Sequence, residues 1–311
     1  MRRDEKGPAN MNTSDYPSEG SSWEDELSIA IEAGRAAAAE ILPFYESRDA
    51  ETYTKGDGSP VTDADLASDR IIRETIGAAF PGDALLTEEG AKNLDRIDNP
   101  RCWIVDPLDG TAQFVAGTDR FEVLIALVHQ GRPVVAVSVH PPSGAVHAAI
   151  AGAGAWLVDD KVRRPFKLTP AQTPPRLASS KWYRGREGRD MILHVAEELG
   201  AAEPPVLEIG FQPRAFDDRI RTYDVFIGLW PEGDMSIAQE WDLAASDLIV
   251  NEAGGRFTDM WGRFHRYNKR NTSISGGLLA SADPEVHQRV LDAFAKERPE
   301  EAPPADPVPV R

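Results

Sequence analysis

Acidic residues follow two short apolar runs of this sequence at the point where each run ends. Residues 84–86 lead into Glu88 and Glu89 through Thr87, and residues 102–105 lead into Asp106-Pro-Leu-Asp109. Both runs are typical of buried strands, and side chains at strand ends are held rigidly while they face a cleft. Carboxylates that converge there repel one another unless cations neutralise them, and oxygen-only ligation favours hard ions. The pattern therefore predicts a site for Mg²⁺, with Mn²⁺ as a substitute.

The residues directly after Asp109 predict a phosphate site beside these carboxylates. Gly110 permits close approach of the backbone, and Thr111 begins a predicted helical turn over residues 111–114. Free N–H groups at the start of a helix bind phosphate oxygens. Carboxylates that hold metal beside a phosphate cradle point to phosphoryl chemistry, with a small-molecule phosphate ester as the substrate.

Other chemistries fit these residues less well. An Asp-x-x-Asp-Gly turn could be only a surface loop, and that alternative stays open for the motif taken alone. Pro107 and Leu108 do not fit the calcium loop of an EF-hand. Phosphatases of the haloacid dehalogenase type use Asp-x-Asp-Gly-Thr, whereas these aspartates are three positions apart. HExxH, Gly-x-Ser-x-Gly and Walker motifs do not occur, and Cys102 within an apolar run is typical of a buried structural cysteine.

The N-terminal half must supply the strands that hold these residues. A helix is predicted over residues 23–42, with Ser22 as N-cap and Pro43 at its end. A second helix is predicted from Thr62 to Phe80, because Thr62-x-x-Asp65 is a capping-box pattern and apolar residues then recur every four positions. The β-rich segments between Gly/Pro turns predict an antiparallel meander over residues 121–129, 133–140 and 145–150.

The C-terminal half alternates helix and strand beyond a Pro-rich linker at residues 169–175. Its predicted helices cover residues 191–199 and 241–253, its predicted strands cover 256–259 and 278–280, and Asp283-Pro284 starts a final helix. We therefore predict an α/β protein in two domains. An N-terminal α+β domain at 21–168 carries most of the metal ligands, and a C-terminal α/β domain follows at 169–296.

Composition limits where this chain works and what it binds. Residues 1–20 and 297–311 are polar or acidic, which predicts disordered tails, and Met11 could be the true start in place of Met1. A net charge of −17 argues against a nucleic-acid polymer as partner, because backbone binding needs a basic surface. The N-terminus has no apolar signal segment and no run is apolar enough to cross a membrane. With one cysteine in 311 residues, we expect a cytoplasmic protein without membrane contact.

Four segments with this order and spacing resemble the inositol monophosphatase superfamily. They are residues 57–65 (DGSPVTDAD), 87–89 (TEE), 103–111 (WIVDPLDGT) and 240–245 (EWDLAA), and the resemblance covers nearly everything from residue 23 to 295. The resemblance implies a layered α/β/α/β/α sandwich with a metal cleft between its halves. It also implies a Mg²⁺-dependent phosphomonoesterase that uses direct attack of metal-activated water. Inhibition by lithium and a homodimer are further implications of the family.

By match of motif, the resemblance implies which residues hold the metal. Glu88, Asp106 and the Leu108 carbonyl would hold a first Mg²⁺ ion. Asp106, Asp109 and Asp242 would hold a second, and Glu88 would help to hold a weaker third.

The same match implies which residues act on water and phosphate. Asp65 and Thr111 would orient and deprotonate the attacking water, with Glu88 also counted as catalytic. The backbone of Gly110 and Thr111 would bind the phosphate. Read from the residues alone, Asp65 could be only the acid of a capping box, and Asp242 only an acid in the first turn of a helix.

The substrate prediction rests on a lesser resemblance. Residues 117–127 are closer to the 3′(2′),5′-bisphosphate nucleotidase branch of the family than to its inositol-1-phosphate branch. In segment 263–270, Arg266 and Lys269 could contact a second phosphate, and Tyr267 or the nearby Trp261 could stack on adenine, although the segment could also be a solvated loop. We therefore predict hydrolysis of adenosine 3′,5′-bisphosphate to AMP. The alternatives are an inositol-1-phosphate phosphatase, a histidinol or sugar phosphatase, and a metal-binding structural protein without turnover.

Overall fold

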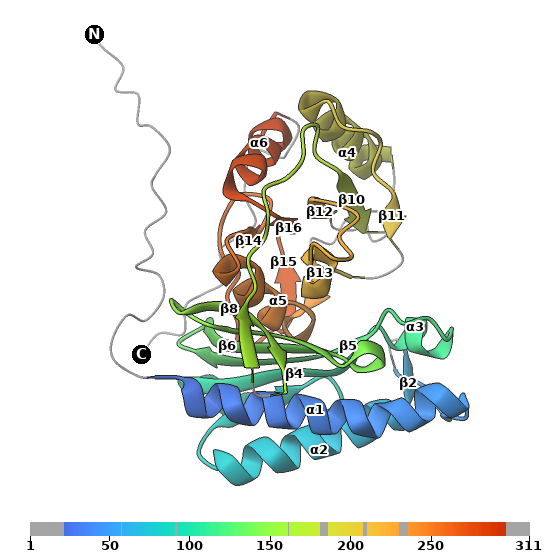
Figure 1. Cartoon of the computed structure of the whole chain (residues 1–311), viewed down its shortest axis with the longest axis vertical. Helices are drawn as coiled ribbons and strands as arrows, with labels where there is room; N and C mark the ends of the chain where they lie inside the picture. The colour runs from blue at the N-terminus through green and yellow to red at the C-terminus, as the bar shows by residue number, and fades with distance from the viewer. Residues whose placement is uncertain are drawn as a thin grey trace.

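The computed structural model describes residues 22–296 apart from 57, 91–92, 161, 181–185, 208–209 and 230–235. The predicted tails, and the choice between Met1 and Met11, lie outside the described residues. Within them, helices and sheets alternate in five layers, and the predicted α/β/α/β/α sandwich is confirmed. Figure 1 shows the layers in order from the first helical pair, α1 (Glu24–Ser47) and α2 (Asp63–Ala79), to the last, α4 (Arg186–Leu199) and α6 (Pro284–Phe294).

A seven-stranded sheet forms the second layer. Its strands lie in chain order, and each neighbouring pair is antiparallel except the first, which is parallel. The strands are β3 (Ala84–Thr87), β4 (Arg101–Asp109), β5 (Glu122–His129), β6 (Arg132–His140), β7 (Ala145–Ile150), β8 (Gly154–Asp159) and β9 (Val162–Pro165). The predicted meander is confirmed and continues through β8 and β9. Sequence patterning misses β9, whose four residues are mainly exposed and include two arginines, Arg163 and Arg164, in place of an apolar alternation.

The side chains of β4 alternate between two buried faces. Trp103 and Val105 pack among residues of α1 and α2, while Cys102 and Ile104 pack among residues of α5 (Glu240–Glu252). A strand buried on both faces has a continuous apolar sequence, which is why its position is predictable. Burial raises the pKa of the Cys102 thiol to about 12, as a structural cysteine requires.

Helix α2 begins at the predicted capping box. Thr62 is its N-cap, and the Asp65 carboxylate accepts a hydrogen bond of 2.8 Å from the Thr62 backbone N–H. This box places Asp65 in the first turn, where the side chain is almost completely buried.

Helix α1 differs from its prediction at both ends. Its N-cap is Trp23 in place of Ser22, and the helix continues through Pro43 to Ser47. Proline cannot donate the backbone hydrogen bond of a helix interior, so its presence predicts an end there. The residues after Pro43 pack on the core, where the Tyr45 ring lies 5.0 Å from the Phe121 ring. This packing offsets the lost hydrogen bond, and tertiary contacts override local propensity.

The C-terminal half contributes a five-stranded sheet in the order β11-β10-β12-β16-β14. Helix α5 lies between the two sheets, and α4 and α6 cover the outer face. The Asp283 side chain caps α6 as predicted, accepting from the Val286 N–H at 2.9 Å. The strands are β10 (Leu177–Ser180), β11 (Val206–Leu207), β12 (Val225–Gly228), β14 (Arg256–Thr258) and β16 (Leu278–Ser281).

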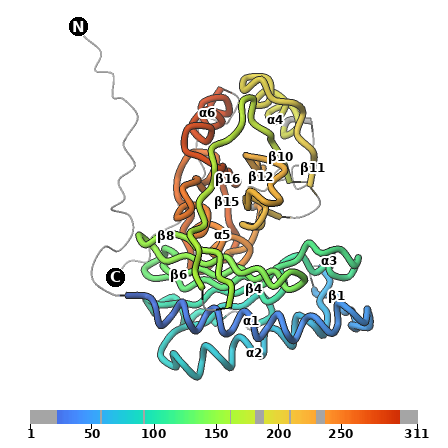
Figure 2. The backbone as a smooth tube through the Cα atoms, viewed as in Figure 1, coloured from blue at the N-terminus to red at the C-terminus, as the bar shows by residue number. Residues whose placement is uncertain are grey.

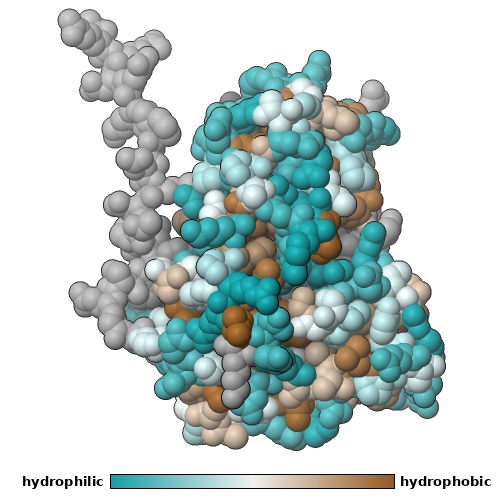
Figure 3. All heavy atoms as spheres, in the orientation of Figure 1, coloured by the Kyte–Doolittle hydropathy of each residue, from teal (hydrophilic) through white to brown (hydrophobic). Residues whose placement is uncertain are grey.

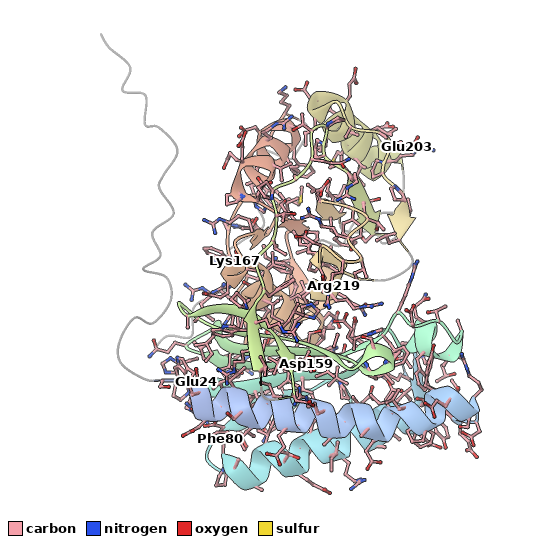
Figure 4. The ribbon with its side chains drawn as sticks, in the orientation of Figure 1. Glu24, Phe80, Asp159, Lys167, Glu203 and Arg219 are labelled. Carbon is pink, nitrogen blue, oxygen red and sulfur yellow. The ribbon has the colours of Figure 1, made fainter. Side chains whose placement is uncertain are left out.

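The chain passes between the halves at residues 166–168. The Phe166 N–H donates to Ala155 in β8, and the Leu168 N–H donates to the Ala253 carbonyl that follows α5. Figure 4 shows Lys167 on this segment, between the two sheets, and Arg219 on the C-terminal side of the same junction. The predicted domain boundary after residue 168 falls here and stays a prediction.

Short elements complete one edge of the first sheet. The hairpin of β1 (Thr52–Thr54) and β2 (Pro60–Thr62) packs beside α3 (Thr111–Val115), and Figure 2 shows the two together at one end of the layer. Another small sheet, of β13 (Ser236–Gln239) and β15 (Ser273–Ser275), leads directly into α5. These elements surround the end of β4 that carries the predicted aspartates.

The face of the molecule in Figure 3 is mainly hydrophilic, with hydrophobic residues scattered among polar ones. Among the helices that the structure describes, none has the length and apolar character needed to span a bilayer.

Candidate metal centre and active site

Three aspartates converge where β4 ends. Oxygen atoms of Asp106, Asp109 and Asp242 all lie within 4.8 Å of one another. Residues three positions apart on a regular strand face opposite sides of the sheet. The pairing of β4 with β5 shifts between Asp106 and Asp109, and the Leu108 N–H donates back to the Asp106 carboxylate at 3.0 Å. This local irregularity lets both aspartates face the same site.

Asp242 reaches the cluster from the other half of the molecule. It is the third residue of α5, and its carboxylate accepts a hydrogen bond of 2.7 Å from the Gln239 N–H at the N-cap. The capping bond uses one oxygen of Asp242 and fixes the side chain towards Asp106 and Asp109. The residue is therefore both a capping acid and a member of the cluster.

Burial makes this cluster electrostatically unfavourable without a cation. It raises the pKa of Asp106 and Asp242 well above the usual range, and the neighbouring carboxylates raise both further. Burial also raises the pKa of Asp109 to about 7, and the charge of Glu88 adds to the rise. A hydrogen bond from Gln212 lowers this pKa but does not cancel the rise. No basic side chain among the described residues pairs with these three aspartates. A set of buried carboxylate oxygens of this kind fits a hard divalent cation.

Glu88 lies beside the aspartates and has a basic partner of its own. Its N–H continues the pairing of β3 with β4 by donating to the Val105 carbonyl at 3.1 Å. Its carboxylate accepts a hydrogen bond of 2.6 Å from Lys55 Nζ, and the same ammonium also bonds Glu89. Lys55 belongs to the turn between β1 and β2, close in sequence to the Asp57–Asp65 motif, and that position was its only signal.

Asp65 and Thr111 form a hydrogen-bonded pair next to the cluster. Thr111 Oγ1 lies 2.9 Å from Asp65 Oδ1 and 3.2 Å from the Leu108 carbonyl, and it has one proton to donate. The other Asp65 oxygen accepts from the N–H and hydroxyl of Thr62. Burial raises the pKa of Asp65, and these hydrogen bonds oppose the rise.

The cluster opens into a cavity of about 510 Å³ that both halves of the protein line. Glu88, the aspartates and Leu108 to Gln113 form one end, and Gly110 has a φ of 92°, which favours glycine at the turn into α3. None of the described residues that line the cavity is basic. Residues from the second half form the other end, which is mainly apolar: Phe211, Phe226, Ile237, Ala238, Trp241 and Leu278.

Gln212 contacts the cluster without any signal in the sequence. Its Nε2 donates to Asp109 Oδ2 at 2.6 Å. Gln212 lies in the predicted C-terminal domain, whereas Asp109 lies in the predicted N-terminal one. The next residues continue this junction, because Arg214 Nε lies 3.1 Å from the buried Glu122 on β5. Only the packing of the two halves brings Gln212 to Asp109.

The predicted contacts for a second phosphate lie elsewhere. Lys269 is 8% exposed, and its Nζ donates to the Ser273 carbonyl at 3.0 Å. Tyr267 is 1% exposed and its hydroxyl donates to Asp247. Arg266 lies against Gly131 at the turn between β5 and β6, the far end of the sheet from Asp109. None of the three lines the cavity.

A second hollow of about 410 Å³ lies between residues 170–173 and the start of α6. Its carboxylates include Asp283, which already caps α6 and accepts a hydrogen bond from the Ala171 N–H. It has no acidic cluster comparable to the one in the first cavity among the described residues.

Comparison with known proteins adds to this geometry. The chain matches the model of the Inositol monophosphatase family over residues 22–216 and 219–299. This chain belongs to the inositol monophosphatase family. A histidinol-phosphatase of Mycobacterium tuberculosis (strain ATCC 25618 / H37Rv) is 34% identical over 247 residues, which cover 76% of this chain and 88% of that protein. An inositol-1-monophosphatase of Rhizobium meliloti (strain 1021) is 32% identical over 267 residues, covering 85% of this chain and 95% of that one.

The fold comparison agrees with the family. The crystal structure of the extragenic suppressor protein suhB from Bartonella henselae aligns with a TM-score of 0.68 at 24% identity, covering 88% of this chain and all of that one. The predicted superfamily is confirmed, and the family and its named relatives indicate a phosphatase, a phosphoric monoester hydrolase. Which phosphate ester it cleaves is a separate question, because these relatives have different names.

Proposed function

We propose that this member of the inositol monophosphatase family is a Mg²⁺-dependent phosphomonoesterase that acts on a small ester with one phosphate. The observation that carries the proposal is the buried cluster of Asp106, Asp109 and Asp242, which has no basic partner among the described residues and borders the Asp65–Thr111 pair. These aspartates would hold two or three Mg²⁺ ions together with Glu88 and the Leu108 carbonyl. Bound Mg²⁺ supplies charge neutralisation and lowers the pKa of water.

The pair of Asp65 and Thr111 is suited to orient the attacking water. Thr111 Oγ1 donates its single proton to Asp65 or Leu108, so its lone pairs are left to accept a hydrogen bond from water. Asp65, fixed by Thr62, can take up the proton that leaves through the threonine hydroxyl. Gly110 and Thr111 would bind the phosphate through their backbone N–H groups, as the family motif implies.

The described lining of the cavity favours a single phosphate over a bisphosphate. A second phosphate is bound by cations, and Lys269, Arg266 and Tyr267 lie away from the cavity. The nucleotidase prediction thereby loses the contacts on which it rested. Relatives named histidinol-phosphatase and inositol-1-monophosphatase support a compact organic group, and these two substrates are the leading candidates.

A substrate panel tests this proposal. Phosphate release is measured from histidinol phosphate, inositol 1-phosphate and adenosine 3′,5′-bisphosphate, with Mg²⁺ or with excess EDTA. We expect hydrolysis only with Mg²⁺, a higher kcat/KM for one of the monophosphates, and inhibition by lithium. Full turnover by demetallated protein would refute the metal dependence, and a preference for the bisphosphate would restore the nucleotidase.

A second experiment tests direct attack of water. One turnover in ¹⁸O-labelled water should place the label in the released phosphate. The carboxylates serve here as ligands and as a base, so no covalent phosphoenzyme is expected. Trapping of a phosphoaspartate at Asp106 or Asp109 would contradict this part of the proposal.

A further inference from the structure

A serine hydroxyl in the same cavity has no hydrogen-bond partner among the residues that the structure describes. Ser180 is the last residue of β10, its side chain is 2% exposed, and its Oγ makes no hydrogen bond to any of these residues. The residue lines the cavity that also contains Asp106 and Asp109. A buried polar atom without a partner is unfavourable, so such an atom in a binding cavity points to a group that the ligand supplies.

The direction of Ser180 follows from the alternation of β10. Leu177 belongs to the outer core under α4 and α6, and Ala178 belongs to the inner core that includes α5. Ser179 therefore faces the outer layer, and Ser180 faces the inner one, where the cavity lies. Ser179 is also fully buried but does not line the cavity, which makes it a matched control on the opposite face of the same strand.

The surroundings of Ser180 at this end of the cavity are apolar. Phe211, Phe226, Trp241 and Leu278 are each at most 5% exposed and line the cavity with it. The nearby Gln239 side chain already has partners, because its Oε1 accepts from Thr272. The described apolar wall thus offers one unpaired hydroxyl to a bound molecule.

We propose that Ser180 Oγ binds a hydroxyl or amino group on the organic part of the substrate while the aromatic wall covers its carbon skeleton. This inference rests on the proposed function, since it requires the phosphate to lie at the carboxylate end of the same cavity. The substrate class is then a phosphate monoester whose organic part carries a neutral or amino polar group, not a second phosphate. Ser180 is a specificity-determining residue and takes no part in breaking the phosphate ester bond.

Three phosphate esters and two variants test the role of Ser180. Wild type, Ser180→Ala and Ser179→Ala are compared with Mg²⁺ on histidinol phosphate, inositol 1-phosphate and phenyl phosphate. Phenyl phosphate has a flat apolar ring and no polar group for Ser180. For the better of the two polar substrates, Ser180→Ala should lower kcat/KM by about three- to tenfold, mainly through a higher KM. Its kcat/KM for phenyl phosphate should stay within about twofold of wild type, which also shows that the variant is folded.

The control variant separates binding from general destabilisation. Ser179→Ala should leave all three substrates unchanged within about twofold. An equal loss on all substrates with Ser180→Ala, no loss on any, or the same loss with Ser179→Ala would each overturn the role of Ser180. If phenyl phosphate is hydrolysed with Mg²⁺ in those cases, the proposed function survives. If wild type hydrolyses none of the three esters with Mg²⁺, both proposals fall.

Discussion

Buried aspartates at two places in this protein differ in what neutralises their charge. Asp224, before β12, lies 2.8 Å from the Arg176 guanidinium. Burial alone would raise the pKa of Asp224, but the hydrogen bonds and charge of Arg176 outweigh burial and hold the pKa below its usual range. For Asp106 and Asp242, burial and neighbouring carboxylates act in the same direction and raise the pKa. Asp224 is paired with two arginines, Arg176 and Arg221, whereas the carboxylate cluster has no basic partner among the described residues and under the proposed function would be neutralised by a cation.

This difference separates structural from functional charge. A paired carboxylate strengthens the fold and gains nothing from added metal. A cluster without a basic partner weakens the metal-free fold and gains stability when a cation binds, because binding to the native state stabilises it. Substitutions at the two places should therefore have opposite effects on activity and stability.

The largest expected effect is on turnover. Asp106→Asn removes a carboxylate that the cluster shares, and kcat should fall by about 10³-fold or more, since metal ions supply several kcal/mol of transition-state stabilisation. The measurement is phosphate release at saturating Mg²⁺ from whichever monophosphate proves the better substrate. A fall of less than about tenfold would place the metal chemistry elsewhere.

Asp224→Asn is the matched control for that change. It should leave kcat within about twofold and lower the free energy of unfolding by about 1–3 kcal/mol, because it weakens the charged hydrogen bonds to the partly exposed Arg176 and removes the ion pair with Arg221. Denaturant unfolding measures the loss. A variant that kept full stability but lost activity would reverse the comparison.

Acid should weaken the C-terminal half through a buried histidine. His287 on α6 lies between Ser281 and Thr258, and burial, followed by the charge of Arg256, lowers its pKa to about 3. The unfolded chain takes up a proton near pH 6.5 and the folded one does not, so stability is lost as pH falls below that value. His287 should contribute a loss of about 2 kcal/mol between pH 7 and 5.

The pH dependence of unfolding in His287→Gln checks this value. The variant should lose about 2 kcal/mol less than wild type over the same pH range, whatever its stability at pH 7. If the free energy of unfolding fell equally with pH in wild type and His287→Gln, this histidine would not be held neutral in the folded state.

The metal-free site should respond to acid in the opposite direction. Raised carboxylate pKa values mean that the folded state binds more protons, so protonation relieves repulsion and stabilises the fold as pH falls. In EDTA at pH 8, the free energy of unfolding of Asp106→Asn should then exceed that of wild type by on the order of 1 kcal/mol. Its melting temperature should be about 2–4 °C higher. Saturating Mg²⁺ should remove or invert the difference. A lower melting temperature of the variant in EDTA would mean that the cluster is not strained.

The smallest effect concerns Lys55. Its ammonium occupies one oxygen of Glu88 at 2.6 Å and so competes with a cation for that carboxylate. Lys55→Met should lower the Mg²⁺ concentration for half-maximal activity by about three- to tenfold, because the ammonium no longer competes with Mg²⁺ for the Glu88 carboxylate. A higher concentration would instead show that Lys55 orients Glu88 for metal binding.

Local sequence patterns predicted the parts of the site that local structure builds. The Thr62–Asp65 capping box, the buried run before Asp106 and the turn after Asp109 are all recognisable within a few residues. Gln212 on Asp109 depends instead on how the two halves pack, and no sequence pattern carries that information. The same limit explains the correction at Pro43, where packing of the following residues outweighs a helix-ending signal.

The error over segment 263–270 has a different cause. Its basic residues suggest a solvated or phosphate-binding surface, because lysine is seldom buried without a partner. Lys269 and the preceding Asn268 are buried because their backbone N–H groups donate to the carboxylate of Glu240, which is itself inaccessible to solvent. Recognition of that carboxylate requires the fold, since Glu240 lies about thirty positions away in the sequence.

Calorimetric titration of metal-free protein with Mg²⁺ tests the central claim most directly, because it requires no knowledge of the substrate. The chain leaves Asp106, Asp109 and Asp242 without a basic partner among the described residues. Wild type should therefore bind Mg²⁺ saturably, Asp106→Asn at least about tenfold more weakly, and Asp224→Asn with the affinity of wild type. Equal binding by wild type and Asp106→Asn would contradict the claim that this cluster is the metal site.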